Sequence, residues 1–147
     1  MIFPMNLPPI PQTQTANLQC YTGNQTDLNY VVNTINKIRK ANNLPELTLD
    51  QRLNDSASKK AQDMIDRNYW SHEDPEGKMS WNLIKDSGYK YKKAGENMAK
   101  NYDNLNSVEQ WLQSPSHLEN ILDPDFTHVG LSNNGDFKVM HFGLEKK

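Results

Sequence analysis

Four histidines carry most of the chemistry that this sequence could perform, and two of them lie outside expected strands. His72 follows an aromatic pair and begins an acidic loop, directly after the end of an expected helix. His117 lies on the first turn of a short helix that we expect to begin at Ser114-Pro115. Each of these two imidazoles is as consistent with a surface position as with a binding site. His128 and His141 lie inside expected strands, where we interpret them as packed or edge residues and not as ligands.

The sequence lacks the short motifs of several common enzyme classes. It contains no His-Glu-x-x-His pair, no cysteine pair, no calcium-binding loop, no Gly-x-Ser-x-Gly elbow and no phosphate-binding loop. Its one cysteine, Cys20, cannot close an intramolecular disulfide, and its surroundings would not activate a thiol. We interpret Cys20 as an ordinary thiol and not as an attachment site for a lipid or a second chain. Covalent catalysis and nucleotide chemistry are therefore disfavoured.

Composition limits the number of domains and the class of partner. The chain has 147 residues, the length of one domain with a short extension. Its net charge is −2 and three of its 16 basic residues are arginine, so it lacks a basic field for nucleic acid. No apolar run is long enough to span a membrane, and residues 1–20 lack the pattern of a signal peptide. We therefore expect no nucleic-acid partner and no transmembrane segment, and we expect a monomer.

Hydrophobic periodicity predicts five helices after a Pro- and Gln-rich leader or linker over residues 1–26. The first is expected from Asp27 to the Asn42-Asn43 pair. Asp50 is expected to cap a second helix that runs to Asn68. Its buried stripe is predicted at Leu53, Ala57, Ala61, Met64 and Ile65. The three shorter helices are expected near residues 80–87, from Asn106 or Ser107 through Leu112, and from Ser114 to Leu122.

The last part of the chain has the pattern of strands. Residues 126–131 and 137–144 are apolar and aromatic, and residues 133–136 between them have the composition of a hairpin turn. Residues 89–100 fit neither a long helix nor a clean strand, so a strand and an irregular loop are both open there. Because helices come first and strands late, the order favours an α+β fold over a doubly wound parallel sheet. Residues 27–147 are expected to form a single domain.

Four short motifs follow one another in an order that resembles a known family. They are Trp70-Ser71-His72, Gly95-Glu96-Asn97, Trp111 followed by Ser114 to Leu122, and Thr127-His128-Val129-Gly130. With this spacing they resemble the bacterial branch of the CAP superfamily, which takes in cysteine-rich secretory proteins, antigen 5 and plant pathogenesis-related proteins. The module is also called the SCP domain, and the resemblance extends from about Leu28 to Leu144.

The resemblance implies a three-layer α-β-α sandwich with a mostly antiparallel central sheet and a cleft that gathers two histidines and two acidic residues. Matched residue by residue, the histidines correspond to His72 and His117, and the acid of the Gly-Glu-Asn motif corresponds to Glu96. The second acid of the animal and plant members falls on Ser114, which is a departure from their pattern. The candidate cleft therefore contains His72, Glu96, Ser114 and His117.

Two imidazoles brought together can bind Zn²⁺ or another divalent cation, but two protein ligands make a weak and exchangeable site. Glu96 could complete the coordination, orient one histidine from behind, or act as a base toward bound water. Alternatively, Glu96 and the histidines only hold loops together through hydrogen bonds. Large apolar residues expected to be core anchors are Trp81, Met98, Trp111 and Phe142.

By resemblance, we expect a secreted or cell-surface protein. The favoured function is a binding module that engages a small apolar ligand, a lipid, a cell-wall component or another protein. The alternative is a metal-assisted hydrolase, a peptidase, with the metal on His72 and His117 and with Glu96 as base. A catalytic metal usually has three protein ligands, and this chain offers two histidines plus a carboxylate that cannot easily be both ligand and base. No catalytic residue is therefore assigned, and a purely structural domain is a third alternative.

Overall fold

The computed structural model describes residues 25–100, 104–132, 134 and 137–147. The elements, in chain order, are α2 (Gln25–Ala41), β1 (Thr48–Leu49), α3 (Gln51–Arg67), α4 (Trp81–Asp86), β2 (Tyr91–Lys100), α5 (Asn104–Leu112), α6 (Pro115–Ile121), β3 (His128–Leu131) and β4 (Phe137–Glu145). Most of the expected leader lies outside the described residues. None of the described helices is long and apolar enough to cross a membrane.

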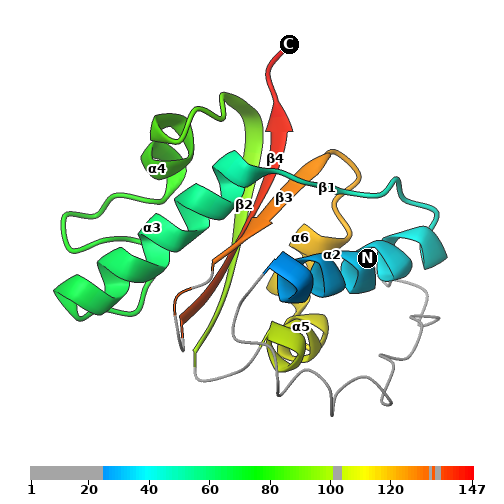
Figure 1. The fold of residues 1–147 in the computed structure, drawn as a ribbon, viewed down its shortest axis with the longest axis horizontal. Helices are drawn as coiled ribbons and strands as arrows, with labels where there is room; N and C mark the ends of the chain where they lie inside the picture. Colours follow the sequence, from blue (N-terminus) through cyan, green and yellow to red (C-terminus); the bar gives the residue numbers. More distant parts are fainter. Residues whose placement is uncertain (1–24, 101–103, 133, 135–136) are drawn as a thin grey trace.

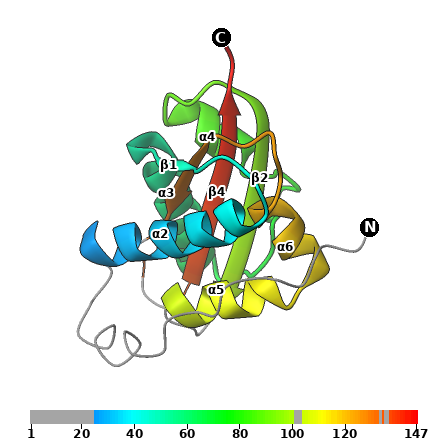
Figure 2. The same ribbon diagram turned by 90° about the vertical axis from the view of Figure 1, so that its right-hand side faces the viewer.

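A four-stranded sheet divides the molecule into layers (Figure 1). Its strand order is β1-β3-β4-β2, in which β1 pairs with β3 in parallel, while β3 and β2 both pair with β4 antiparallel. The helices α3 and α4 cover one face, and α2, α5 and α6 cover the other (Figures 1 and 2). The predicted α+β fold, an α-β-α sandwich with a mostly antiparallel sheet, is therefore confirmed.

The helix α3 begins and ends where its sequence predicts. The Asp50 carboxylate accepts a hydrogen bond from the Arg52 main-chain nitrogen at 2.9 Å, which satisfies one of the free amides of the first turn. Asn68 adopts a left-handed conformation with φ 54°, and its main-chain nitrogen donates to the Met64 carbonyl oxygen. These two caps fix the length of α3, and the loop that contains His72 follows it.

One residue of the predicted buried stripe of α3 is exposed in the structure. Leu53, Ala57, Ala61 and Met64 are buried as expected, but Ile65 is 45% exposed, so its prediction is wrong. The buried face widens on its other side instead, where Ser56 and Lys60 have 0% and 1% of their surface exposed. Ser56 has a polar partner on the sheet and Lys60 has partners in the loop after α3, as described below, and these contacts place both residues inside.

Gly130 lets α3 approach the sheet closely. A Cβ atom at this position of β3 would lie 2.2 Å from both the Leu53 carbonyl carbon and the Asn54 main-chain nitrogen. No side chain can occupy that space without moving the helix. The Asn54 Oδ1 atom also accepts a hydrogen bond from the Leu131 main-chain nitrogen at 2.9 Å, which fixes the helix against β3.

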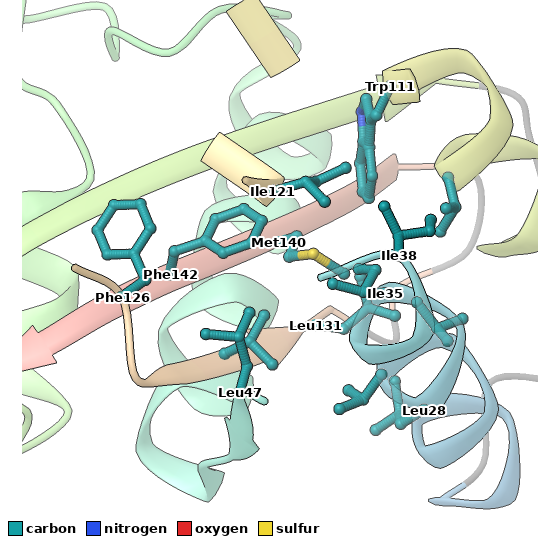
Figure 3. Packing of buried hydrophobic residues seen from close by; sticks show 14 of the residues in the cluster. Leu28, Ile35, Ile38, Leu47, Trp111, Ile121, Phe126, Leu131, Met140 and Phe142 are labelled. Carbon is teal, nitrogen blue, oxygen red and sulfur yellow. The ribbon is translucent and has the colours of Figure 1, made fainter. Parts of the chain in front are cut away.

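The largest apolar cluster of the described residues fills the space between the sheet and α2, α5 and α6 (Figure 3). Trp111 is 1% exposed, and its indole nitrogen donates to the Met98 carbonyl oxygen at 2.9 Å, which joins α5 to β2. Burial confirms three of the expected core anchors, Met98, Trp111 and Phe142. The helix α2 begins at Gln25, two residues before its expected start. The first turn of a helix carries no apolar periodicity that would mark it.

The remaining elements follow the sequence closely. Residues 91–100 form β2, which decides the open choice between strand and loop. The two late strands pair antiparallel as expected, with β3 beginning at His128. Most of the predicted turn, residues 133 and 135–136, lies outside the described residues. Ser114 and Pro115 open α6 as predicted, although the Ser114 side chain makes no capping hydrogen bond.

Candidate functional site

The Gly95-Glu96-Asn97 motif lies on β2, the edge strand of the sheet, and its side chains alternate between the two helical layers. Glu96 faces the α3 layer, and Asn97 faces α6. Gly95 is on the α6 side as well, where a Cβ atom would lie 3.0 Å from both Asn120 Oδ1 and Phe126 Cζ. Glycine at position 95 therefore allows α6 to pack tightly against this edge.

Glu96 is held by two imidazoles. Its Oε1 atom lies 2.7 Å from His72 Nδ1, and its Oε2 atom lies 2.7 Å from His141 Nε2. The Glu96 side chain is 2% exposed. Burial alone would raise the pKa of Glu96, but the hydrogen bonds from His141 and His72 outweigh it and lower the pKa to about 2. The carboxylate is thus ionised at neutral pH, and each imidazole donates an N–H to one of its oxygens.

His141 connects Glu96 to α3. It lies directly opposite Glu96 in the register of β2 and β4, it is fully buried, and its Nδ1 atom lies 2.7 Å from Ser56 Oγ. The interpretation of His141 as a packed residue agrees with this burial, but sequence reasoning missed its contact with Glu96. The signal that could have found it is strand register, because directly opposed residues bring their side chains together across a ladder.

The loop between α3 and α4 presents His72 to Glu96. Lys60 on α3 is 1% exposed, and its Nζ atom donates to the His72 carbonyl oxygen at 2.9 Å and to Tyr69 Oη at 3.2 Å. Burial lowers the pKa of Lys60, and the charge of Glu96 opposes this shift. A buried cation therefore fixes the main chain of the residue that carries the imidazole. Nothing in the sequence marked Lys60, since lysine is rarely buried.

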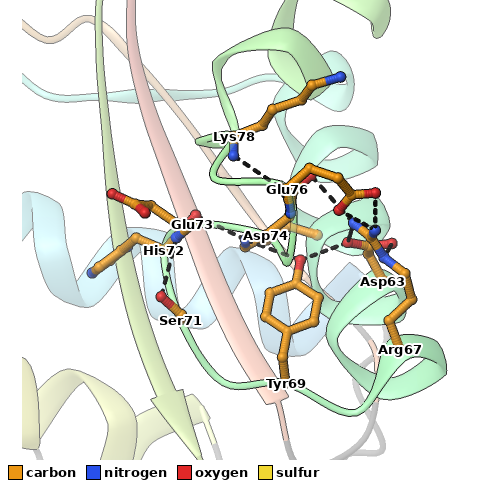
Figure 4. Close-up of polar contacts among 10 residues, drawn as sticks. Asp63, Arg67, Tyr69, Ser71, His72, Glu73, Asp74, Glu76 and Lys78 are labelled. Atoms are coloured by element: carbon orange, nitrogen blue, oxygen red, sulfur yellow. Dashed lines mark hydrogen bonds and ion pairs between the residues drawn. The ribbon is translucent and has the colours of Figure 1, made fainter.

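Arg67 closes the same loop at the surface (Figure 4). Its guanidinium lies 2.8 Å from Asp63, 3.2 Å from Asp74 and 2.6 Å from Glu76. The Asp74 carboxylate in turn accepts hydrogen bonds from the main-chain nitrogens of Glu76 and Lys78. Figure 4 shows this network on the side of the loop away from the His72 imidazole. Exposed ion pairs are individually weak, but several on one arginine restrict the conformation of the loop.

The amides of Asn97 and Asn120 hold the second candidate histidine from the α6 side. Asn97 Nδ2 donates to the His117 carbonyl oxygen at 3.1 Å. Asn120 Nδ2 donates to Asn97 Oδ1 at 2.9 Å and to the Glu96 carbonyl oxygen at 3.2 Å. The His117 imidazole is half-buried, and burial, followed by the nearby His72, lowers its pKa. His117 therefore keeps its neutral form to a lower pH than a free imidazole does.

His72 and His117 line one groove of about 340 Å³ at the outer edge of β2. Glu96 forms part of its floor, so the structure brings three of the four predicted cleft residues together. The fourth, Ser114, does not line the groove; Ser116 does, and the two serine hydroxyl oxygens lie 3.5 Å apart. Ser114 is the N-cap of α6, and Ser116, two residues further along, faces the groove in its place.

Trp81 is a correction to the predicted core anchors. It is only partly buried and lines the groove together with Met79. It opens α4, where its ring packs edge-on against Tyr91 at 6.4 Å between centroids, and it packs at the border of the buried cluster of Leu53, Ile84 and Tyr89. Composition cannot distinguish such a wall residue from a core residue, because both are large and apolar.

The groove offers two imidazoles and no larger set of metal ligands. Because the Nδ1–H of His72 donates to Glu96, Nε2 is the ring nitrogen that can offer a lone pair to a metal ion. In the described part of the chain, no group of three or more His, Cys, Asp or Glu side chains is arranged to hold a metal ion. The donor set therefore fits a divalent cation with two protein ligands and water, which is a weak site.

Comparison with known proteins identifies the family. Residues 32–138 match the sequence model described as CAP: Cysteine-rich secretory protein family, which is more than half of the chain. The chain belongs to the CAP family. The CAP domain is 40% identical over 102 residues to the uncharacterized protein YkwD of Bacillus subtilis (strain 168), covering 69% of this chain and 40% of that protein. It is 30% identical over 113 residues to the uncharacterized membrane protein YlbC of the same organism, covering 76% of this chain and 33% of that protein. The chain thus spans well under half the length of either curated relative.

Solved structures confirm the bacterial CAP fold. An extracellular protein containing a SCP domain from Bacillus anthracis has a TM-score of 0.78 and 27% identity, over 94% of this chain and 45% of that chain. An outer surface protein from Borrelia burgdorferi has a TM-score of 0.75 and 25% identity, over 83% of this chain and 95% of that chain. The resemblance predicted from the four short motifs is therefore confirmed.

Proposed function

We propose that this CAP domain is an extracytoplasmic binding module whose groove holds a divalent cation, such as Zn²⁺, between His72 and His117. The bound cation and the groove would together engage a lipid, a cell-wall component or a protein. The two solved relatives described as an extracellular protein and an outer surface protein support the location. The groove at the edge of β2 supports the binding role.

The hydrogen bond between Glu96 and His72 Nδ1 is the observation that carries this proposal. A carboxylate that accepts from one ring nitrogen fixes the tautomer and the orientation of the imidazole, and it raises the basicity of the other nitrogen. His117 lines the same groove, and its lowered pKa favours the neutral imidazole that a metal requires. When bound, the cation would polarise a ligand oxygen or nitrogen at its open positions.

The alternative function, a metal-assisted hydrolase with Glu96 as base, receives less support. Both Glu96 oxygens already accept hydrogen bonds, and the side chain is 2% exposed. A general base has to reach the proton that it abstracts and has to hold a pKa near the working pH. A buried carboxylate with a pKa of about 2 suits the orienting role better.

Zinc titration by calorimetry tests the proposal. The wild-type domain should bind one Zn²⁺ per chain at pH 7.5, and His72→Ala and His117→Ala should each weaken binding at least tenfold. His128→Ala is the matched control, because His128 contacts Tyr89 and Thr127 and does not line the groove. Unchanged zinc affinity in the His72 and His117 variants would reject the site.

A further inference from the structure

Within the residues that the structure describes, the outer edge of β2 is unpaired at Ala94, inside the groove. The sheet order places β2 at an edge. Two of its main-chain carbonyl oxygens accept hydrogen bonds from side chains and not from a neighbouring strand. The Glu96 carbonyl oxygen accepts from Asn120 Nδ2 at 3.2 Å, and the Met98 carbonyl oxygen accepts from Trp111 Nε1 at 2.9 Å. These carbonyls therefore point away from β4. Successive residues of a strand direct their N–H and C=O groups to opposite edges. The N–H and C=O of Ala94, two residues before Glu96, therefore point to the same outer edge.

The partner strand supports the same orientation for Ala94. Ala94 lies opposite Gly143 on β4, and the Gly143 carbonyl oxygen accepts a hydrogen bond from the Thr127 main-chain nitrogen at 2.9 Å. The main chain of Gly143 thus faces β3 and cannot pair with Ala94. In the described part of the chain, no hydrogen bond joins the Ala94 main chain to another element. Ala94 also lines the groove, so its outward N–H and C=O lie at the edge of β2 that borders the groove.

The two walls of the groove differ in chemistry. Met79 and Trp81 form an apolar wall on the α3 and α4 side, whereas Ser116 and His117 form a polar wall on the α6 side. A strand laid beside β2 would send successive side chains to these two walls in turn. An acyl chain would leave both the polar wall and the Ala94 amide without partners, which disfavours a lipid as the occupant.

We infer that the groove binds an extended peptide segment of a partner protein, added as a further strand to β2 at Ala94. Peptide binding here rests on the proposed function, because it uses the same groove, and it specifies an extended peptide as the class of ligand. Main-chain hydrogen bonds from Ala94 supply affinity for any extended peptide. The unlike walls select peptides whose apolar and polar residues alternate.

Peptide binding can be tested without knowing the natural partner. Dodecapeptides enriched on the wild-type domain from a random display library are synthesised and titrated in the presence of EDTA and again with Zn²⁺. Ala94→Pro removes the outward N–H, and proline is tolerated on an edge strand at such a position. It should weaken binding of the selected peptides at least tenfold, whereas Ala94→Ser, which keeps the N–H, should stay within about twofold of wild type.

Amide exchange in the wild type provides a measurement that needs no variant. Saturation with a selected peptide should slow hydrogen exchange at the Ala94 amide at least tenfold. Zinc titration of the wild type in the absence of peptide measures the metal site by itself, so loss of peptide binding and loss of the metal site are separate outcomes. Failure to enrich any peptide, equal binding to Ala94→Pro, or an unchanged Ala94 exchange rate would each overturn the inference.

Discussion

Glu96 and His141 lie directly opposite each other on β2 and β4, with Glu96 Oε2 2.7 Å from His141 Nε2. His72 Nδ1 lies at the same distance from the other carboxylate oxygen. The buried carboxylate is thus fixed at both ends by imidazoles from a strand and from a loop. Glu96 is therefore the residue that sets the position of the His72 imidazole relative to the groove.

Replacing Glu96 by glutamine should destabilise the domain and weaken zinc binding together. A glutamine amide cannot accept from both imidazoles, so one buried donor loses its partner, at a cost of about 1 to 3 kcal/mol. Zinc affinity should fall by about 10- to 100-fold, because His72 loses its orienting partner. Urea denaturation and calorimetry measure the two effects, and the exposed Glu119→Gln is the matched control. Metal-dependent peptide cleavage by wild type, abolished in Glu96→Gln at unchanged stability, would instead favour the hydrolase.

Stability should fall in acid in a way that depends on Glu96. Its pKa is about 2 in the folded chain and near the ordinary value of 4.5 in the unfolded chain. A depressed folded pKa stabilises the fold fully above about pH 4.5, by roughly 3 kcal/mol, and this contribution disappears as pH falls toward 2. The difference in unfolding free energy between wild type and Glu96→Gln should therefore narrow by half or more between pH 6 and pH 3. A constant difference over that range would contradict the assigned pKa shift.

Zinc affinity should decrease steeply between pH 7.5 and pH 5. Imidazoles must be neutral to bind a metal, and protons compete for the same nitrogens. The lowered pKa of His117 means that its neutral form persists further into acid than that of a free imidazole. Calorimetric titrations at several pH values measure the decrease. A zinc affinity that does not change over this pH range would show that the metal ligands are not imidazoles.

Arg39 and Arg67 should respond very differently to the same substitution. Arg39 is fully buried and donates to the carbonyl oxygens of Pro45, Ile121 and Asp123 at 2.8 to 2.9 Å. Lysine cannot reproduce this fork, so Arg39→Lys should cost about 2 to 4 kcal/mol. The Arg67 side chain is 35% exposed, and Arg67→Lys should lower the free energy of unfolding far less than Arg39→Lys does. Equal losses of unfolding free energy in the two variants, measured by chemical denaturation, would show that burial of the arginine does not set the size of the loss.

Removal of residues 1–24 should leave the thermal midpoint of the domain nearly unchanged. This segment is rich in Pro, Gln, Thr and Asn and offers little apolar surface to a core. Differential scanning calorimetry of the full chain and the shortened chain makes the comparison. A loss of several degrees would show that apolar residues such as Ile2, Phe3 or Leu7 contribute to the folded domain.

The sequence by itself determined the features that depend on neighbours along the chain. Asp50 and Asn68 bound α3, because caps act within one turn of helix, and Pro115 opens α6, because proline fits the first helical position. The order of four short motifs was enough to identify the CAP family and its sandwich fold. It was also enough to single out His72, Glu96 and His117, which line one groove.

Only the tertiary structure decided the features that depend on contacts distant in sequence. The register of β2 against β4 makes His141 the second partner of Glu96. The packing of the loop after α3 buries Lys60 and gives its Nζ atom a partner, the His72 carbonyl oxygen, at 2.9 Å. The same packing left Ile65 at the surface and opened the Ala94 edge of β2. Periodicity specifies which side chains share a face, but the partner of that face is set by strand register and layer packing, which local sequence does not encode.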